Sequence, residues 1–170
     1  MKIKSKLLAA ALLSTASVGA FAYDAQVNFD GLVTDQTCDI NGTSVRPAQI
    51  NVTLPTIGVG ALPTVGSWAQ NTKFTIQLTN CTAASTTVHW EPMVNVDSAT
   101  GALKNTNAGG TNAQLRVLDS NYTPIDMRSD AGITFSGTSK DLDYYAQYYA
   151  KVVPATTGVL STYGYITLTY

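Results

Sequence analysis

The sequence has few of the residue types that carry most catalytic and metal-binding chemistry. Its 170 residues include one histidine, His89, and one glutamate, Glu91, and charged residues make up only 12%. A catalytic triad or a histidine- and cysteine-based metal centre needs more of these groups than the chain offers. We therefore predict no catalytic residue, no cofactor and no metal site.

Three patterns could be mistaken for sites. Glu91 could in principle pair with an aspartate for acid–base chemistry, but nothing around it indicates such a pair. Residues 58–63 contain two glycines without the third glycine and the helix of a phosphate-binding loop. The acidic residues of 119–130 lack the spacing of a calcium loop and are typical of turns.

Long hydrophobic runs are also missing, and the one apolar run near the start is short. Lys2, Lys4 and Lys6 precede the apolar residues 7–13, and Ala20-Phe21-Ala22 follows. This order is typical of a cleavable secretory signal peptide, and the run is well below the roughly 20 residues that span a bilayer. We expect residues 1–22 to be removed and the mature protein to begin at Tyr23.

Basic residues are scarce in the expected mature chain. Cleavage removes three of the ten Lys and Arg residues and none of the eleven acidic ones, which leaves seven basic residues. Neither a basic patch nor an apolar run long enough to span a membrane remains. We therefore expect neither nucleic-acid binding nor stable insertion into a membrane.

Only two cysteines are present, Cys38 and Cys81. Export places them in an oxidising compartment, where pairing is favoured over two separate buried thiols. We expect one disulfide, joining the first strand of the domain to the end of a strand through Ile76 and Leu78.

What the sequence does contain is short alternation of apolar and polar residues between turn formers, which indicates an all-β protein. About 148 mature residues suit one domain with a single core. Glycine- and proline-containing residues 58–66 and residues 105–112 are expected to be loops. The predicted strands, enough for a sandwich, are 25–33, 49–54, 73–78, 87–94, 113–118, 142–153 and 163–170.

The segment 142–153 has two readings. Tyr144 and Tyr148 stand at helical i,i+4 spacing, as do Tyr145 and Tyr149. The alternation of Leu142, Tyr144, Ala146, Tyr148, Ala150 and Val152 against polar neighbours instead favours a strand. We predict a strand.

The two ends of the mature chain both carry alternating apolar residues. Near the start, one strand face would present Ala25, Val27, Phe29, Gly31 and Val33. At the other end, Ile166, Leu168 and Tyr170 share a face, with Tyr165, Thr167 and Thr169 opposite. Taken alone, these patterns are also compatible with ordinary edge strands of a complete sandwich.

The spacing of these residues resembles the type 1-like pilins of the chaperone–usher pathway. Val27-x-Phe29-x-Gly31-x-Val33, followed by Cys38, is similar to the N-terminus of that family. Gly158 stands twelve residues before Tyr170, as in the family's C-terminal pattern, although the family's tyrosine is usually penultimate. The interval from Cys38 to Cys81 and the Tyr144–Ala150 run also resemble pilins.

This resemblance implies an immunoglobulin-like sandwich, residues 36–170, that lacks its final strand. Residues 23–35 would then be a donor-strand extension that completes a neighbouring subunit. A groove for that strand, recognised beforehand by a periplasmic chaperone, would involve Gly158, Tyr163, Tyr165, Ile166, Leu168 and Tyr170. The resemblance further implies an outer-membrane usher as partner, other copies of the chain in a helical filament, and a non-enzymatic role in a fimbria for attachment at the cell surface.

Other functions remain as alternatives. A tip lectin of the same fimbria would be expected to have an additional N-terminal binding domain, for which the length leaves no room. A secreted β-sandwich hydrolase would need a clustered acid–base set that is not found. A minor adaptor subunit is not separated from a repeating subunit by the sequence.

Overall fold

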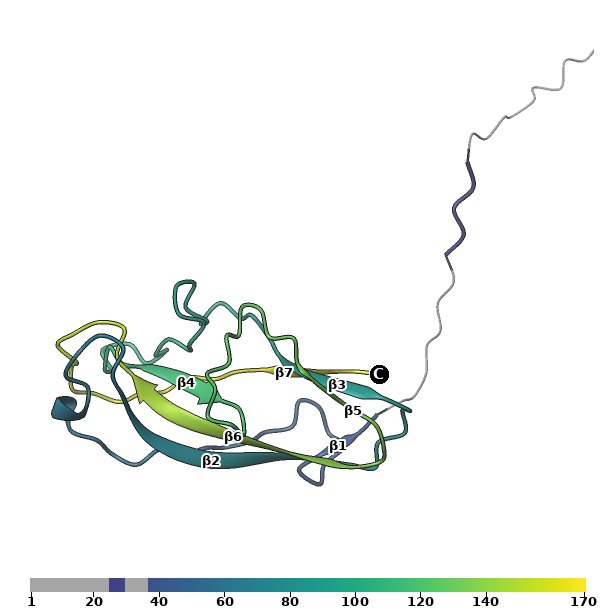
Figure 1. The fold of residues 1–170 in the computed structure, drawn as a ribbon, viewed down its shortest axis with the longest axis horizontal. Helices are drawn as coiled ribbons and strands as arrows, with labels where there is room; N and C mark the ends of the chain where they lie inside the picture. Colours follow the sequence, from purple (N-terminus) through teal and green to yellow (C-terminus); the bar gives the residue numbers. More distant parts are fainter. Residues whose placement is uncertain (1–24, 30–36) are drawn as a thin grey trace, which may run out of the picture. The chain divides into compact units, whose positions relative to one another are not determined.

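A computed structural model of the chain describes residues 25–29 and 37–170 (Figure 1). The chain divides into two units, Met1–Thr34 and Asp35–Tyr170. Of the first unit, residues 25–29 are described; they form neither strand nor helix, and Val27 and Phe29 are exposed. The signal peptide expected at residues 1–22 lies outside the described residues.

The second unit is built from two antiparallel sheets (Figure 1). The first sheet has the order β1 (Asp39–Ile40), β2 (Trp68–Thr79), β6 (Lys140–Tyr149) and β4 (Gln114–Leu118). The second has the order β5 (Ile133–Phe135), β3 (Thr86–Trp90) and β7 (Ile166–Thr169). A 3₁₀ turn, η1 (Val59–Ala61), is the only helical element among the described residues. The all-β prediction is confirmed.

The core lies between the sheets because each strand buries alternate side chains. Ile76 and Leu142 of one sheet and Val88 and Phe135 of the other belong to one buried cluster. Tyr144 in β6 stacks on Phe74 at 5.7 Å and meets the Trp90 ring edge-on at 5.5 Å, measured between ring centroids. Burial raises the pKa of Tyr144 to about 12, so its hydroxyl is neutral.

The side chain of Asp97 is a buried carboxylate that accepts several hydrogen bonds. Asp97 accepts hydrogen bonds from Lys151 Nζ at 2.6 Å and Gln114 Nε2 at 2.9 Å. It also accepts from the backbone N–H groups of Ala99 and Thr100, at 2.9 and 3.1 Å. Burial alone raises the pKa of Asp97, but these hydrogen bonds, led by that from Lys151, outweigh burial and hold the pKa well below 3.8.

Most of the predicted strands are present with shifted ends. The strands expected at 73–78, 87–94, 113–118 and 163–170 correspond to β2, β3, β4 and β7. The ambiguous 142–153 segment is a strand, although β6 begins and ends earlier, at Lys140–Tyr149. Residues 105–112 are a loop as expected, and the loop at 58–66 contains η1. The short strands β1 and β5 were not predicted.

The strand predicted at 49–54 is wrong, because no ladder forms there. Residues 48–54 nevertheless alternate between half-buried and exposed side chains, as a strand would. No backbone–backbone hydrogen bond involves residues 47–57 within the described part of the chain. The segment has the side-chain pattern of a strand, but no described strand pairs with it.

In the ranges that the structure covers, no helix is long and apolar enough to cross a membrane. Nor do His, Cys, Asp and Glu side chains gather there in threes that could hold a metal ion. His89 Nε2 lies 3.1 Å from Glu91 Oε1, so the single histidine, in β3, and the single glutamate, just after β3, lie against each other.

Candidate assembly groove

A groove of about 820 Å³ opens onto the core along the C-terminal strand. One wall is formed by residues 46–54, and the other by residues 160–168 together with Tyr170. Its floor is part of the core, formed by Phe74, Ile76, Trp90, Leu103, Leu115, Val117 and Ala146. The groove therefore borders the core at the position where a complete sandwich would have another strand.

The wall at residues 46–54 presents apolar side chains and an unpaired backbone. Ala48, Ile50, Val52 and Leu54 are half-buried and line the groove, while the residues between them are exposed. Since the backbone of 47–57 has no backbone partner among the described residues, its C=O groups, and its N–H groups except at Pro47 and Pro55, are available to a strand laid in the groove.

The opposite wall contains β7, which pairs with β3 along one of its edges. The register places Leu168 opposite Val88 and Ile166 opposite Trp90. No described strand pairs with the other edge of β7. Ile166 and Leu168 turn toward the core, whereas Tyr163 and Tyr165 are exposed and meet edge-on at 5.5 Å. Among the described residues, both walls thus carry unpaired edges along one channel with an apolar floor.

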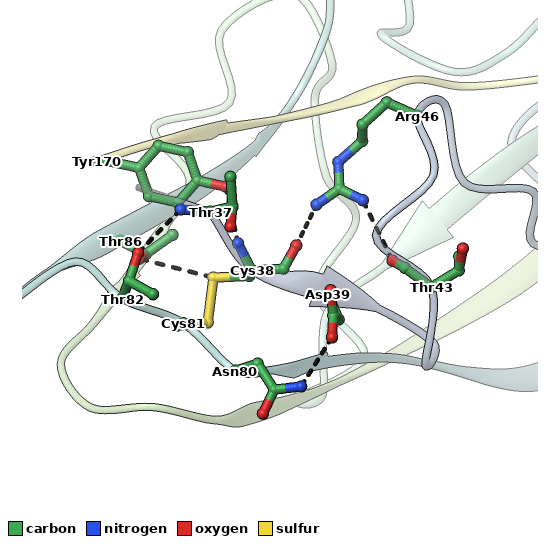
Figure 2. The surroundings of a disulfide bond; sticks show 10 residues. All are labelled: Thr37, Cys38, Asp39, Thr43, Arg46, Asn80, Cys81, Thr82, Thr86 and Tyr170. Carbon is green, nitrogen blue, oxygen red and sulfur yellow. Dashed lines mark hydrogen bonds between the residues drawn. A yellow bond between two sulfur atoms is a disulfide. The ribbon is translucent and has the colours of Figure 1, made fainter. Parts of the chain in front are cut away.

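A covalent and hydrogen-bonded junction holds one end of the groove. Cys38 and Cys81 form a disulfide with an S–S distance of 2.11 Å, which confirms the predicted pair (Figure 2). The bridge joins the residue before β1 to the end of β2, where Asp39 pairs with Thr79. The N–H of Cys38 also donates to the Tyr170 hydroxyl at 3.1 Å, so the end of the chain is held beside the bridge.

Arg46 is the single charged residue among those that line the groove. Its guanidinium donates to the carbonyl oxygens of Cys38 and of Thr43, so it is occupied at the same junction (Figure 2). A lining of apolar and uncharged polar residues with one engaged cation suits an uncharged segment, because a buried charge without a partner is costly.

The structure places five of the six predicted C-terminal residues in the groove lining: Tyr163, Tyr165, Ile166, Leu168 and Tyr170. Gly158 lies elsewhere, with φ of +141°. A Cβ at this position would come within 2.7 Å of the Thr111 nitrogen and 2.8 Å of the Gly110 carbonyl carbon. Glycine is therefore needed at 158 for loop packing.

The predicted donor residues are only partly described. Ala25, Val27 and Phe29 are exposed, with 90% of the Phe29 surface accessible, while Gly31 and Val33 lie outside the described residues. Sequence reasoning missed the wall at residues 46–54 and the Phe74 and Trp90 floor. The alternation of 49–54 was visible, but nothing in the sequence shows that this segment lacks a partner.

Comparison with known proteins agrees with this architecture. Residues 27–170 match the family model described as fimbrial protein. The chain is 34% identical to the major fimbrial subunit SMF-1 of Stenotrophomonas maltophilia, covering 91% of this chain and 97% of that protein. It is 30% identical to the F17 fimbrial protein of Escherichia coli, covering 95% and 96% of the two chains.

Solved structures show the same fold. A Burkholderia pseudomallei antigen and type I fimbria protein is 30% identical, with a TM-score of 0.58 over 81% of this chain and 91% of that one. A chain of a chaperone–usher pilus is 22% identical, with a TM-score of 0.58 over 87% and 96% of the two chains. The fold is an incomplete immunoglobulin-like sandwich.

The chain therefore belongs to the fimbrial protein family. Within that family it is a structural subunit of surface fimbriae.

Proposed function

We propose that the chain polymerises head-to-tail by donor-strand exchange. In this reaction residues 25–33 of one copy occupy the groove of the next copy. The observation that carries the proposal is the groove itself, in which two unpaired edges border an opening of about 820 Å³ onto the core. An extended segment there would complete both ladders and cover apolar side chains, which is the general mode of strand addition.

The donor segment has the complementary chemistry. Ala25, Val27 and Phe29 alternate with polar residues, and Val27 and Phe29 are large apolar side chains exposed to solvent. Alternate side chains of an added strand point to one face, so these three would enter the groove together. Burial of such side chains contributes roughly 1.5–3 kcal/mol each, which favours insertion.

Such a contact joins two different surfaces, the groove of one copy and the N-terminal segment of another. A contact of this kind does not close on itself and generates an open filament. No reacting group is required, so the proposed role is non-enzymatic and serves attachment through the filament. The similarity to a protein named as a major fimbrial subunit favours a repeating subunit over a tip or adaptor subunit.

An open groove before assembly requires protection, because unpaired strand edges promote aggregation. We propose a periplasmic chaperone that lends a strand to the groove, and an outer-membrane usher at which the donor segment of the next copy replaces it. Ile166, Leu168 and the exposed Tyr163 and Tyr165 are the residues of β7 and its approach that the chaperone would contact.

The test is to supply the missing strand within one chain. A copy of residues 25–33 is fused after Tyr170 through a flexible linker, and the native N-terminal copy is deleted. The tethered strand acts at high effective concentration, so the fusion should be a soluble monomer with a cooperative unfolding transition. A matched fusion carrying Val27→Asp and Phe29→Asp in the added copy should aggregate. Equal solubility and stability of the two fusions and of the unfused domain would contradict the proposal.

A further inference from the structure

A second pocket, of about 410 Å³, lies on the face of the β4–β6–β2 sheet that is turned away from the groove. Along β4 and β6, Val117 and Ala146 line the groove, while their neighbours Arg116 and Gln147 line this pocket. The volume falls within the roughly 300–1,000 Å³ of typical ligand sites. Its principal lining residues are Trp68, Asn71, Arg116, Leu118, Tyr122 and Gln147.

Backbone strain concentrates at this pocket. Four of the described non-glycine residues have positive φ, and two of them are asparagines, which tolerate that conformation. The other two are Gln70 at 60° and Tyr122 at 61°. Gln70 lies in the irregularity of β2 between Ala69 and Thr72, beside Asn71 of the pocket. Strain of this kind and strand bulges both cluster at functional sites, where they redirect side chains.

The side chain of Gln147 is largely buried and lines the pocket. Gln147 is 2% exposed. No side-chain hydrogen bond to its amide occurs within residues 25–29 and 37–170, although it lines the cavity. An amide that opens into a cavity can both donate and accept hydrogen bonds there. Gln147 is therefore prepared to bond a hydroxyl group that enters the pocket.

The remaining groups define the chemistry of the ligand. Trp68 and Tyr122 are 54% and 53% exposed, which leaves aromatic surface for an apolar ring face. Arg116 lies 3.6 Å above the centre of the Tyr149 ring, forms no salt bridge with a described residue, and is the single charged residue of the lining. Arginine suits a carboxylate because its fixed donors match two oxygens.

We propose that this pocket binds a saccharide unit that carries a carboxylate. The apolar face of the sugar ring lies on Trp68, the hydroxyl groups bond Gln147 and Asn71, and the carboxylate pairs with Arg116. An apolar peptide would leave Gln147 and Arg116 unsatisfied. The site is on the opposite face of the sheet from the groove, so the proposal is independent of donor-strand exchange.

The test uses intact fimbriae purified from cells that express the chain. Binding of methyl glucuronide and methyl galacturonide is measured by saturation-transfer NMR and titration, beside the neutral methyl glucoside and galactoside. We expect at least one acidic probe to bind about ten-fold more tightly than its neutral counterpart, because a charge-assisted hydrogen bond is lost with the carboxylate. The ring protons of the sugar should receive the strongest saturation, from the aromatic lining.

Variants locate the site. Arg116→Gln should abolish the preference for the acidic probe over its neutral counterpart. Trp68→Leu should weaken the binding of acidic and neutral probes alike. Lys73→Gln is the matched control, since it removes a cation from β2 outside the pocket lining and should leave binding unchanged. The proposal would be overturned if neither acidic probe bound. The proposal would also be overturned if Arg116→Gln still bound the acidic probe more tightly than the neutral one. The same holds if Lys73→Gln lost this preference as fully as Arg116→Gln. If Arg116→Gln yields no fimbriae, the proposal is tested by Trp68→Leu and the saturation pattern instead. Unchanged binding in Trp68→Leu, or weak saturation of the sugar ring protons, would then overturn it.

Discussion

The backbone N–H of Cys38 donates a 3.1 Å hydrogen bond to the hydroxyl of Tyr170, across 132 residues of sequence (Figure 2). This contact brings the start of β1 and the end of β7 together beside the Cys38–Cys81 bridge. At this end of the groove, hydrogen bonds of Cys38 reach Tyr170 of one wall and Arg46 of the other, while the backbone edges along its length stay unpaired among the described residues.

Tyr170→Phe keeps the ring and removes the acceptor of this hydrogen bond. We expect a loss of about 1 kcal/mol in the free energy of unfolding of the strand-complemented monomer, measured by urea titration. Tyr165→Phe is the matched control, because the Tyr165 hydroxyl bonds no described residue. A Tyr170→Phe loss no larger than that of Tyr165→Phe would show that the contact contributes nothing.

Replacing both cysteines with serine should lower stability by about 4 kcal/mol, the chain-entropy value for a loop of 43 residues. The same variant should assemble poorly, because the end of the groove is no longer fixed. Urea titration measures the first effect, and the yield of filaments sheared from cells measures the second. Unchanged stability together with normal filament yield would refute this role of the bridge.

Asp97→Asn should cost at least about 2 kcal/mol at neutral pH, because the amide cannot accept from all of the donors that Asp97 satisfies. The folded-state pKa of Asp97 is lowered, so its contribution to stability is complete above the ordinary value of 3.8 and declines as the pH falls below it. The difference in the free energy of unfolding between wild type and variant should therefore decrease as the pH is lowered from about 5 to about 2. A gap that is constant with pH would contradict this, and exposed Asp141→Asn, the control, should change little at any pH.

Gly31→Arg tests the donor segment at a residue outside the described ranges. A glycine among inward-facing side chains indicates close approach of the acceptor, so a long charged side chain should block insertion. The variant should still form a chaperone complex, since its own groove is unchanged, but produce no filaments by electron microscopy. Gly31→Ala is the smaller matched substitution. Normal filaments from Gly31→Arg would exclude a close fit at this residue.

The strands of the fold could be predicted because their side chains alternate locally. Tyr144 and Tyr148 were assigned to a strand, although helical spacing was also present, and β6 confirms it. The two-residue β1 and the three-residue β5 were not predicted, because so few residues cannot show an alternation of apolar and polar side chains. The 49–54 segment was wrongly predicted as a paired strand, since pairing depends on a neighbour that local sequence does not specify.

The candidate site was predictable only at its C-terminal wall. Ile166 and Leu168 carry the alternation that placed them in the groove, whereas Phe74 and Trp90 join its floor through contacts distant in sequence. Gly158 matched a spacing pattern, yet its position is set by the backbone of Gly110 and Thr111. The pocket at Trp68 and Gln147 arises from a bulge and a turn, and neither has a periodic signature.

Site-specific crosslinking in assembled fimbriae tests donor-strand exchange most directly. A photo-crosslinking benzophenone amino acid replaces Phe29, and filaments are irradiated, dissociated and analysed by gel and mass spectrometry. The account predicts covalent dimers and longer ladders in which residue 29 of one copy is joined to residues 46–54 or 160–170 of another. Crosslinks confined to single chains, or joined to surfaces outside the groove, would contradict it.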